Sequence, residues 1–156
     1  MSMRRVFVVR KDLNLKPGKL GAMIGHLCEA YWTNQIKKYI SPWKKENEDG
    51  QQLSYICNLE LPIDIVDEYV FGPFTKTICE VKNLNQLNKK MDEILSENPW
   101  MKAGEDYGYI NDNCQTDLVP ENSDGTTTIG VWFRPIDDII ARGISHKFKL
   151  YGAFDK

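Results

Sequence analysis

Apolar residues follow two different spacings along the chain, one typical of strands and one of helices. The run VFVV at residues 6–9 is typical of a strand buried on both faces. After a polar turn that contains Pro-Gly, apolar residues recur every three to four positions from about residue 18 to 39, which predicts a helix. The predicted apolar stripe of this helix consists of Leu20, Ile24, Leu27 and Tyr31.

The two spacings continue to the C-terminus. Further strands are predicted at residues 53–61, 75–81, 106–112 and 125–133, and further helices at 63–71, 83–95 and 135–145. The helix at 83–95 has Asn83 as its expected cap, and the last helix has Asp137 and Asp138 in its first turn. Strands that alternate with helices predict one α/β domain over residues 1–156, with layers of helices around a short, mostly parallel sheet.

Composition narrows the class of protein. A chain of 156 residues with 42% hydrophobic and 27% charged residues is long enough to bury a core in one domain. The first apolar run is too short for a signal peptide and no stretch approaches membrane-spanning length, so we expect a cytoplasmic protein away from membranes. The four cysteines are scattered and only two histidines could join them, so we expect reduced thiols and no metal site.

Charge is distributed unevenly although the net charge is only −2. Residues 1–45 hold ten basic and two acidic side chains, whereas residues 46–124 hold five basic and seventeen acidic ones. Phosphate binding depends on the local potential rather than on the total charge. A basic N-terminal face for nucleic acid and a solvated mosaic of charges are both consistent with this pattern.

Lys19 and His26 are the first candidates for chemistry. On a helix they fall within about 20° of each other, near the positive N-terminal end that favours anions. Taken alone, a histidine on a helix flank more often makes a structural hydrogen bond than performs catalysis.

Two loop segments provide further candidates. Asp112 ends a predicted strand and leads into a loop with Cys114 and Thr116, where open α/β folds bind ligands. An Asx-type turn explains the same residues, and Cys114 lacks the sequence signature of a nucleophile partnered by His26. Thr126, at the start of the following strand, offers a hydroxyl but also fits a plain turn.

Three segments of the chain share patterns with one known family. Residues 6–31, VFVVRKDLNLKPGKLGAMIGHLCEAY, are similar to the patterns hhVVRxDL, a Gly-Lys pair and AAQxxHAxxxAY, with the final Ala-Tyr one position closer to the histidine. DNCQTDL at 112–118, GTTTIGVWFRP at 125–135 and KFKLY at 147–151 follow DAGRTQI, GTxTVLxIGP and HLKLY. On these motifs the chain resembles the type II peptidyl-tRNA hydrolases of archaea and eukaryotes. Met23 stands at the family's glutamine, Asn113-Cys114 at its Ala-Gly and Gln115 at its arginine, and the acidic stretch at about 44–74 is an insert.

The resemblance implies a three-layer α/β/α sandwich with a four-stranded mixed sheet, often dimeric, that hydrolyses peptidyl-tRNA without a metal or other cofactor. The positions that match the family's site are Lys19, His26, Asp112, Thr116 and Thr126. Lys19 would bind phosphate or stabilise an oxyanion, Asp112 would orient a base or activate water, the threonines would donate hydrogen bonds, and His26 could be the base. The expected contacts to the tRNA backbone are Arg4, Arg5, Arg10, Lys11, Lys16, Lys37 and Lys38.

A second interpretation keeps the scaffold but not the reaction. In this case the chain is a binding module that holds tRNA or a protein partner without cleaving it, and the insert at 44–74 is the contact surface.

Overall fold

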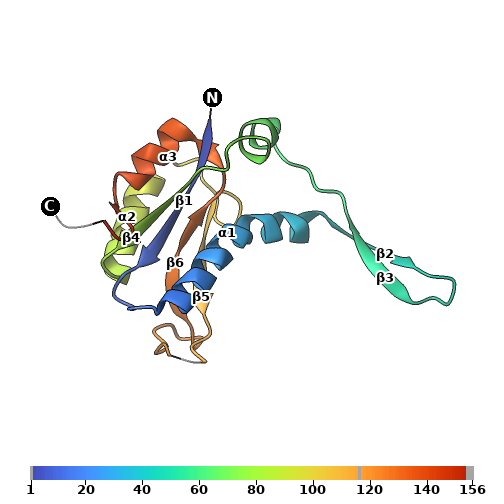
Figure 1. The fold of residues 1–156 in the computed structure, drawn as a ribbon, viewed down its shortest axis with the longest axis horizontal. Helices are drawn as coiled ribbons and strands as arrows, with labels where there is room; N and C mark the ends of the chain where they lie inside the picture. The colour runs from blue at the N-terminus through green and yellow to red at the C-terminus, as the bar shows by residue number, and fades with distance from the viewer. Residues whose placement is uncertain (1, 116, 154–156) are drawn as a thin grey trace.

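A mixed β-sheet forms the centre of the computed structural model, which describes residues 2–115 and 117–153 (Figure 1). Its strands lie in the order β5-β6-β1-β4-β8, and β7 pairs with the start of β1. The bounds are β1 Met3–Arg10, β4 Lys76–Val81, β5 Tyr107–Asp112, β6 Thr127–Phe133, β7 Ile136–Asp137 and β8 Lys149–Leu150. The predicted α/β class and mixed sheet are confirmed, and the two-residue strands β7 and β8 extend the four strands that were expected.

Strand direction differs from the prediction of a mostly parallel sheet. Among the strand pairs of the described chain, β1–β4 is parallel, whereas β1–β6, β5–β6, β1–β7 and β4–β8 are antiparallel. Parallel neighbours require a crossover connection, which the long segment between β1 and β4 supplies. β5 and β6 are consecutive and are joined directly by residues 113–126, so they pair in opposite directions.

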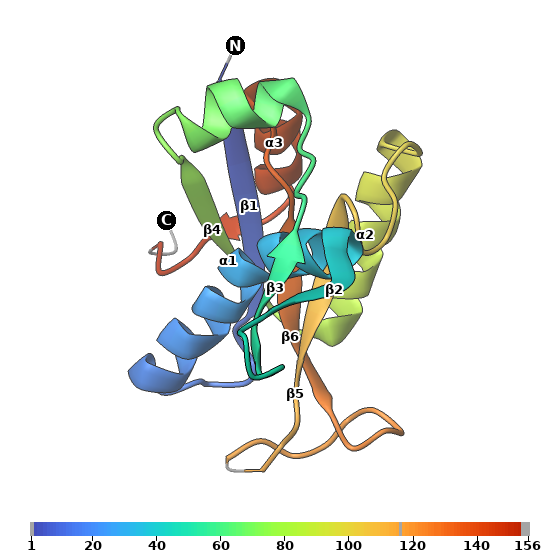
Figure 2. The same ribbon diagram turned by 90° about the vertical axis from the view of Figure 1, so that its right-hand side faces the viewer.

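Helices cover both faces of the sheet (Figures 1 and 2). α1 (Pro17–Tyr39) and the short π-helix η1 (Ile65–Val70) pack on one face, and α2 (Leu84–Glu97) and α3 (Asp138–Ser145) pack on the other. β1 contributes to both cores, because Val6 and Val8 pack with α2 and α3 while Phe7 and Val9 pack with α1. The result is a layer of sheet between two layers of helices.

The buried face of α1 is rotated from the predicted stripe. Its buried residues are Met23, Leu27, Ala30, Tyr31 and Gln35, whereas Leu20 and Ile24 are only partly buried. Met23 is 6% exposed and packs in the core, so it is not a polar-site position. Lys19 and His26 precede and follow Met23 by four and three residues, which places them along one edge of the buried face.

A β-ribbon extends away from the sheet (Figures 1 and 2). β2 (Ile40–Glu46) and β3 (Gln52–Cys57) pair antiparallel, and every residue of β3 is exposed. The strand predicted within 53–61 therefore exists but lies outside the central sheet. β2 was not predicted, because ISPWKKE does not alternate and contains Pro42. The short helix predicted at 63–71 is η1, which buries Ile65 and Tyr69.

The caps of α2 and α3 agree with the sequence. The Asn83 side chain accepts a hydrogen bond from the Gln86 amide at 2.9 Å, and Asp137 accepts one from the Ile139 amide at 2.9 Å. Across residues 2–115 and 117–153, no helix is long and apolar enough to cross a membrane.

Candidate active site

Lys19 and Asp112 form an ion pair at the N-terminal end of α1. Lys19 lies in the first turn of this helix, which begins at Pro17, and Asp112 is the last residue of β5. Lys19 Nζ lies 2.8 Å from Asp112 Oδ1, although the two residues are 93 positions apart. Their side chains are 22% and 11% exposed, so solvent reaches the pair only partly.

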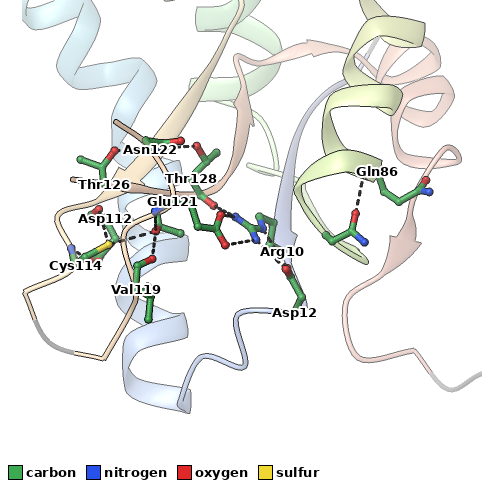
Figure 3. Close-up of polar contacts among 12 residues, drawn as sticks. Arg10, Asp12, Gln86, Asp112, Cys114, Val119, Glu121, Asn122, Thr126 and Thr128 are labelled. Carbon is green, nitrogen blue, oxygen red and sulfur yellow. Dashed lines mark hydrogen bonds and ion pairs between the residues drawn. The ribbon is translucent and has the colours of Figure 1, made fainter. Parts of the chain in front are cut away.

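The other oxygen of Asp112 is fixed by the loop that follows β5. Asp112 Oδ2 accepts a hydrogen bond from the Cys114 amide at 2.9 Å (Figure 3). The hydrogen bond from Lys19 lowers the pKa of Asp112, and the Cys114 amide and the nearby His26 add to this effect against the smaller opposing effect of burial. Asp112 is therefore a carboxylate at neutral pH and acts as an acceptor that orients Lys19.

His26 lies on the same edge of α1, two turns after Lys19. Its side chain is exposed and lines a groove of about 470 Å³ between α1 and β5. The groove also contains Lys37, Tyr109 and Trp132. An imidazole at this position borders both solvent and a cavity, as a group that exchanges protons with a bound water requires.

Thr126 does not join the Lys19–Asp112 pair. Its hydroxyl donates to Asp124 Oδ1 at 2.6 Å, within the turn before β6. The same hydroxyl accepts a hydrogen bond from Asn122 Nδ2 at 3.0 Å (Figure 3). Thr116, the other expected threonine, lies outside the described residues, so its place at the site stays a prediction.

Thr127, the residue after Thr126, lies beside Asp112 instead. It pairs with Asp112 in the β5–β6 register and is fully buried. Its hydroxyl donates to the Val119 carbonyl at 2.6 Å and lies 3.3 Å from Cys114 Sγ. Thr127 thus holds the loop beside Asp112. Only the strand register, which was not predicted, distinguishes it from Thr126.

Arg10 stabilises the same loop from the other side. Its guanidinium is buried, and it contacts Glu121 Oε2 at 2.6 Å, Asp12 Oδ2 at 2.8 Å and the Thr128 carbonyl at 3.0 Å (Figure 3). Burial opposes its charge, but the hydrogen bonds to Glu121 and Asp12 outweigh this effect and raise the pKa of Arg10. Glu121 was not singled out in the sequence, and it ties residues 113–126 to the end of β1.

Two of the expected tRNA contacts are buried, since Arg5 and Arg10 are only 1% and 3% exposed. Arg5 donates to the carbonyls of Phe133 and Cys28 at 3.0 and 2.6 Å and so connects the sheet to α1. Arg4 is partly buried and is paired with Asp138 at 2.8 Å. A buried guanidinium whose donors are satisfied cannot bind phosphate without unfolding its surroundings.

The remaining basic candidates are exposed but do not form one compact patch. They are Lys11, Lys16, Lys37 and Lys38. Lys11 lies 3.4 Å from Glu80 and Lys38 lies 3.5 Å from Glu105. Lys16 and Lys37 flank opposite ends of α1, about 30 Å apart at 1.5 Å per residue. Only an elongated ligand reaches both ends of this row.

Among the residues that the structure describes, no group of three or more His, Cys, Asp or Glu side chains is arranged so that it could hold a metal ion. All four cysteines are free thiols. The groups near Lys19 are the Asp112 carboxylate, the His26 imidazole and the Cys114 thiol, whose Sγ lies 3.5 Å from the Asp112 carbonyl oxygen.

Comparison with known proteins adds little to the geometry. No protein-family model matches the chain, and no curated protein matches it. Among solved structures, the chain is similar to Atu0240, a protein of unknown function from Agrobacterium tumefaciens strain C58. The two are 10% identical, with a TM-score of 0.48, over 97% of this chain and 99% of the other.

Proposed function

We propose that the protein hydrolyses the ester bond of peptidyl-tRNA, with Lys19, Asp112 and His26 as the groups at its site. The observation that carries the proposal is the 2.8 Å contact between Lys19 and Asp112. These residues come from two separate blocks that resemble the type II peptidyl-tRNA hydrolases, and the resemblance implies that they share one site.

The backbone of Cys114 supports the same alignment. Cys114 has a φ of 56°, a left-handed conformation that is uncommon for residues other than glycine. The family pattern has glycine at this position. The loop after β5 therefore keeps a conformation suited to glycine although a cysteine occupies the position.

The proposed reaction assigns a different task to each group. His26 takes a proton from a water, whose oxygen attacks the ester carbonyl carbon. Lys19, oriented by Asp112, stabilises the negative charge that develops on the carbonyl oxygen. The ribose 3′ oxygen then leaves with the proton from the imidazolium, which releases the peptide acid and free tRNA.

The proposal also covers the surroundings of the reaction. The exposed lysines Lys11, Lys16, Lys37 and Lys38 contact tRNA phosphates, and an elongated row of this kind suits a polynucleotide. A substrate of translation implies a cytoplasmic location. The dimer implied by the resemblance is part of the proposal, and light scattering of the purified chain measures it.

The test is peptidyl-tRNA hydrolysis measured beside tRNA binding. We expect Lys19→Ala and Asp112→Ala each to lose at least about a hundredfold in turnover while staying folded and binding tRNA. Lys89→Ala removes an exposed charge of α2, on the other face of the sheet from α1, and should retain nearly full turnover. Wild-type protein that leaves peptidyl-tRNA intact, under conditions where a standard peptidyl-tRNA hydrolase cleaves it, would contradict the proposal.

A binding module is the second candidate, and two observations favour it. Met23 is a core residue at the position where the family has a glutamine. The β2–β3 ribbon exposes Leu53 and Tyr55 at 59% each, and neighbouring exposed apolar side chains of this kind are typical of interaction surfaces. Salt-dependent tRNA binding without turnover would select this candidate. Deletion of the β2–β3 ribbon would also select it, if the deletion abolished binding of a protein partner and left hydrolysis unchanged.

A further inference from the structure

A second cavity, of about 660 Å³, lies away from the Lys19–Asp112 pair. It opens at the carboxyl ends of the parallel strands β1 and β4, beside the first turn of α2 and the segment that follows α3. Figure 3 labels two residues of its lining, Asp12, which follows β1, and Gln86 of α2. Five lysines line it: Lys11, Lys82, Lys90, Lys147 and Lys149.

Carboxylates hold four of these lysines in two pairs. Glu80 is buried, and its Oε1 lies 3.4 Å from Lys11 Nζ and 3.7 Å from Lys149 Nζ. Glu93 Oε2 lies 3.7 Å from Lys90 Nζ and 3.9 Å from Lys147 Nζ. Lys147 Nζ also lies 2.8 Å from Glu97 Oε1. These carboxylates hold the ammonium groups close together around the cavity.

The lining of the cavity has an excess of positive charge. Besides the lysines it contains two carboxylates, Glu80 and Asp12, and Asp12 is already bound by Arg10. Lys82 is exposed and takes part in none of the ion pairs among the described residues around this cavity. The first turn of α2 faces the cavity through Gln86 and contains no acidic residue, so the positive end of the helix adds to the lysines.

We propose that this cavity is a binding site for the phosphate groups of a small phosphorylated ligand. Its volume lies within the range of small-molecule sites, about 300–1,000 Å³. Open α/β sheets bind ligands at the carboxyl ends of their strands. Five lysines around one cavity favour an anion with several charges, and phosphate provides the acceptor oxygens for charge-assisted hydrogen bonds.

The site is independent of peptidyl-tRNA hydrolysis. Of the residues that line it, Lys11 alone is among the expected tRNA contacts, and none belongs to the Lys19, Asp112 and His26 group. Loss of binding at this cavity and loss of hydrolysis are therefore separate results.

Pyrophosphate is the probe, and titration calorimetry of the full chain at 25 mM and 150 mM salt is the measurement. Lys82→Glu is the test variant, because Lys82 lines the cavity and its replacement breaks no ion pair. Lys89→Glu is the control, with the same change in charge on a neighbouring exposed lysine outside the cavity. We expect wild type and Lys89→Glu to bind pyrophosphate equally within about twofold, and Lys82→Glu to bind at least about tenfold more weakly.

Three results would overturn the proposal. The first is no binding of pyrophosphate by the wild type at millimolar concentration, and the second is equal binding by the two variants. The third is a result in which Lys82→Glu weakens tRNA binding, Lys89→Glu does not, and pyrophosphate does not displace the bound tRNA. This last result would assign the cavity to RNA phosphates rather than to a small ligand.

Discussion

The Lys19–Asp112 ion pair should couple the start of α1 to the end of β5 during folding. At 2.8 Å and an effective dielectric constant of about 20, the direct attraction is about 6 kcal/mol before the loss of hydration is counted. The side chains are 22% and 11% exposed, which places the pair between surface and buried pairs. Exposed pairs contribute up to about 1 kcal/mol, and removing one partner of a buried pair costs about 3–5 kcal/mol. We therefore expect a coupling energy of about 1–2 kcal/mol.

A double-mutant cycle of Lys19→Met and Asp112→Asn measures this energy. Methionine keeps most of the aliphatic chain of lysine, and asparagine keeps an oxygen that can accept from the Cys114 amide. Urea unfolding of the four proteins at pH 7 gives the free energies of unfolding. Each single variant should lose the coupling, and the double variant should lose it only once.

The pH dependence follows from the pKa of Asp112, which the Lys19 hydrogen bond lowers. A carboxyl whose pKa is lower in the folded state than in the unfolded state stabilises the fold. This contribution is complete at pH values above the unfolded-state pKa, about 3.9 for aspartate, and is lost as the pH falls through the folded-state pKa. The coupling energy should therefore be equal at pH 6 and pH 8 and should decline below about pH 4. Additive losses at pH 7, or a coupling energy unchanged in acid, would refute the reasoning. Lys16→Met is the control and should change stability by less than about 0.5 kcal/mol.

Three further outcomes are expected. Arg10→Met should lower the free energy of unfolding, measured in urea, by about 2 kcal/mol, because Asp12 and Glu121 lose a buried guanidinium. The salt dependence of tRNA binding should stay unchanged, and a weaker salt dependence would indicate that Arg10 contacts a phosphate. Gly130→Ala should lower the free energy of unfolding, measured by thermal unfolding, by at least about 2 kcal/mol, because the added Cβ would overlap the Val8 carbonyl oxygen. Gly25→Ala is the control and should cause no such loss, because a Cβ at that position contacts no neighbouring atom. Burial raises the pKa of Cys79 to about 11, so iodoacetamide at pH 8 should alkylate exposed Cys57 and spare Cys79; equal rates would contradict this.

Amphipathic elements were predictable because their buried positions repeat at the period of the element. In α2, Leu87, Met91 and Ile94 are buried as their spacing predicts, and Asn83 caps the helix. The direction of a strand has no such local signal. It depends on how the chain returns to the sheet, and the antiparallel pairing of β5 with β6 became clear only from the fold.

The site was predictable only in part, for a similar reason. Nothing in the spacing of Lys19 and Asp112 predicts their contact, and the resemblance alone placed them together. The choice between Thr126 and Thr127 depended on strand register, because a shift of one residue turns each side chain to the opposite face. The β5–β6 pairing is irregular between Ile110 and Asn111, and no local pattern predicts that irregularity.

The charge asymmetry of the sequence has a structural explanation that composition could not provide. Five basic residues of the first 45 pair with acidic residues from the later part of the chain: Arg4 with Asp138, Arg10 with Glu121, Lys11 with Glu80, Lys19 with Asp112 and Lys38 with Glu105. Arg5 is buried against backbone carbonyls. Much of the N-terminal positive charge therefore joins the first strand and helix to the segments that follow. A count of charges along a sequence cannot separate this internal complementarity from a surface for nucleic acid, because both need the same residues. Any phosphate contact along α1 must rely mainly on its exposed lysines, such as Lys16 and Lys37.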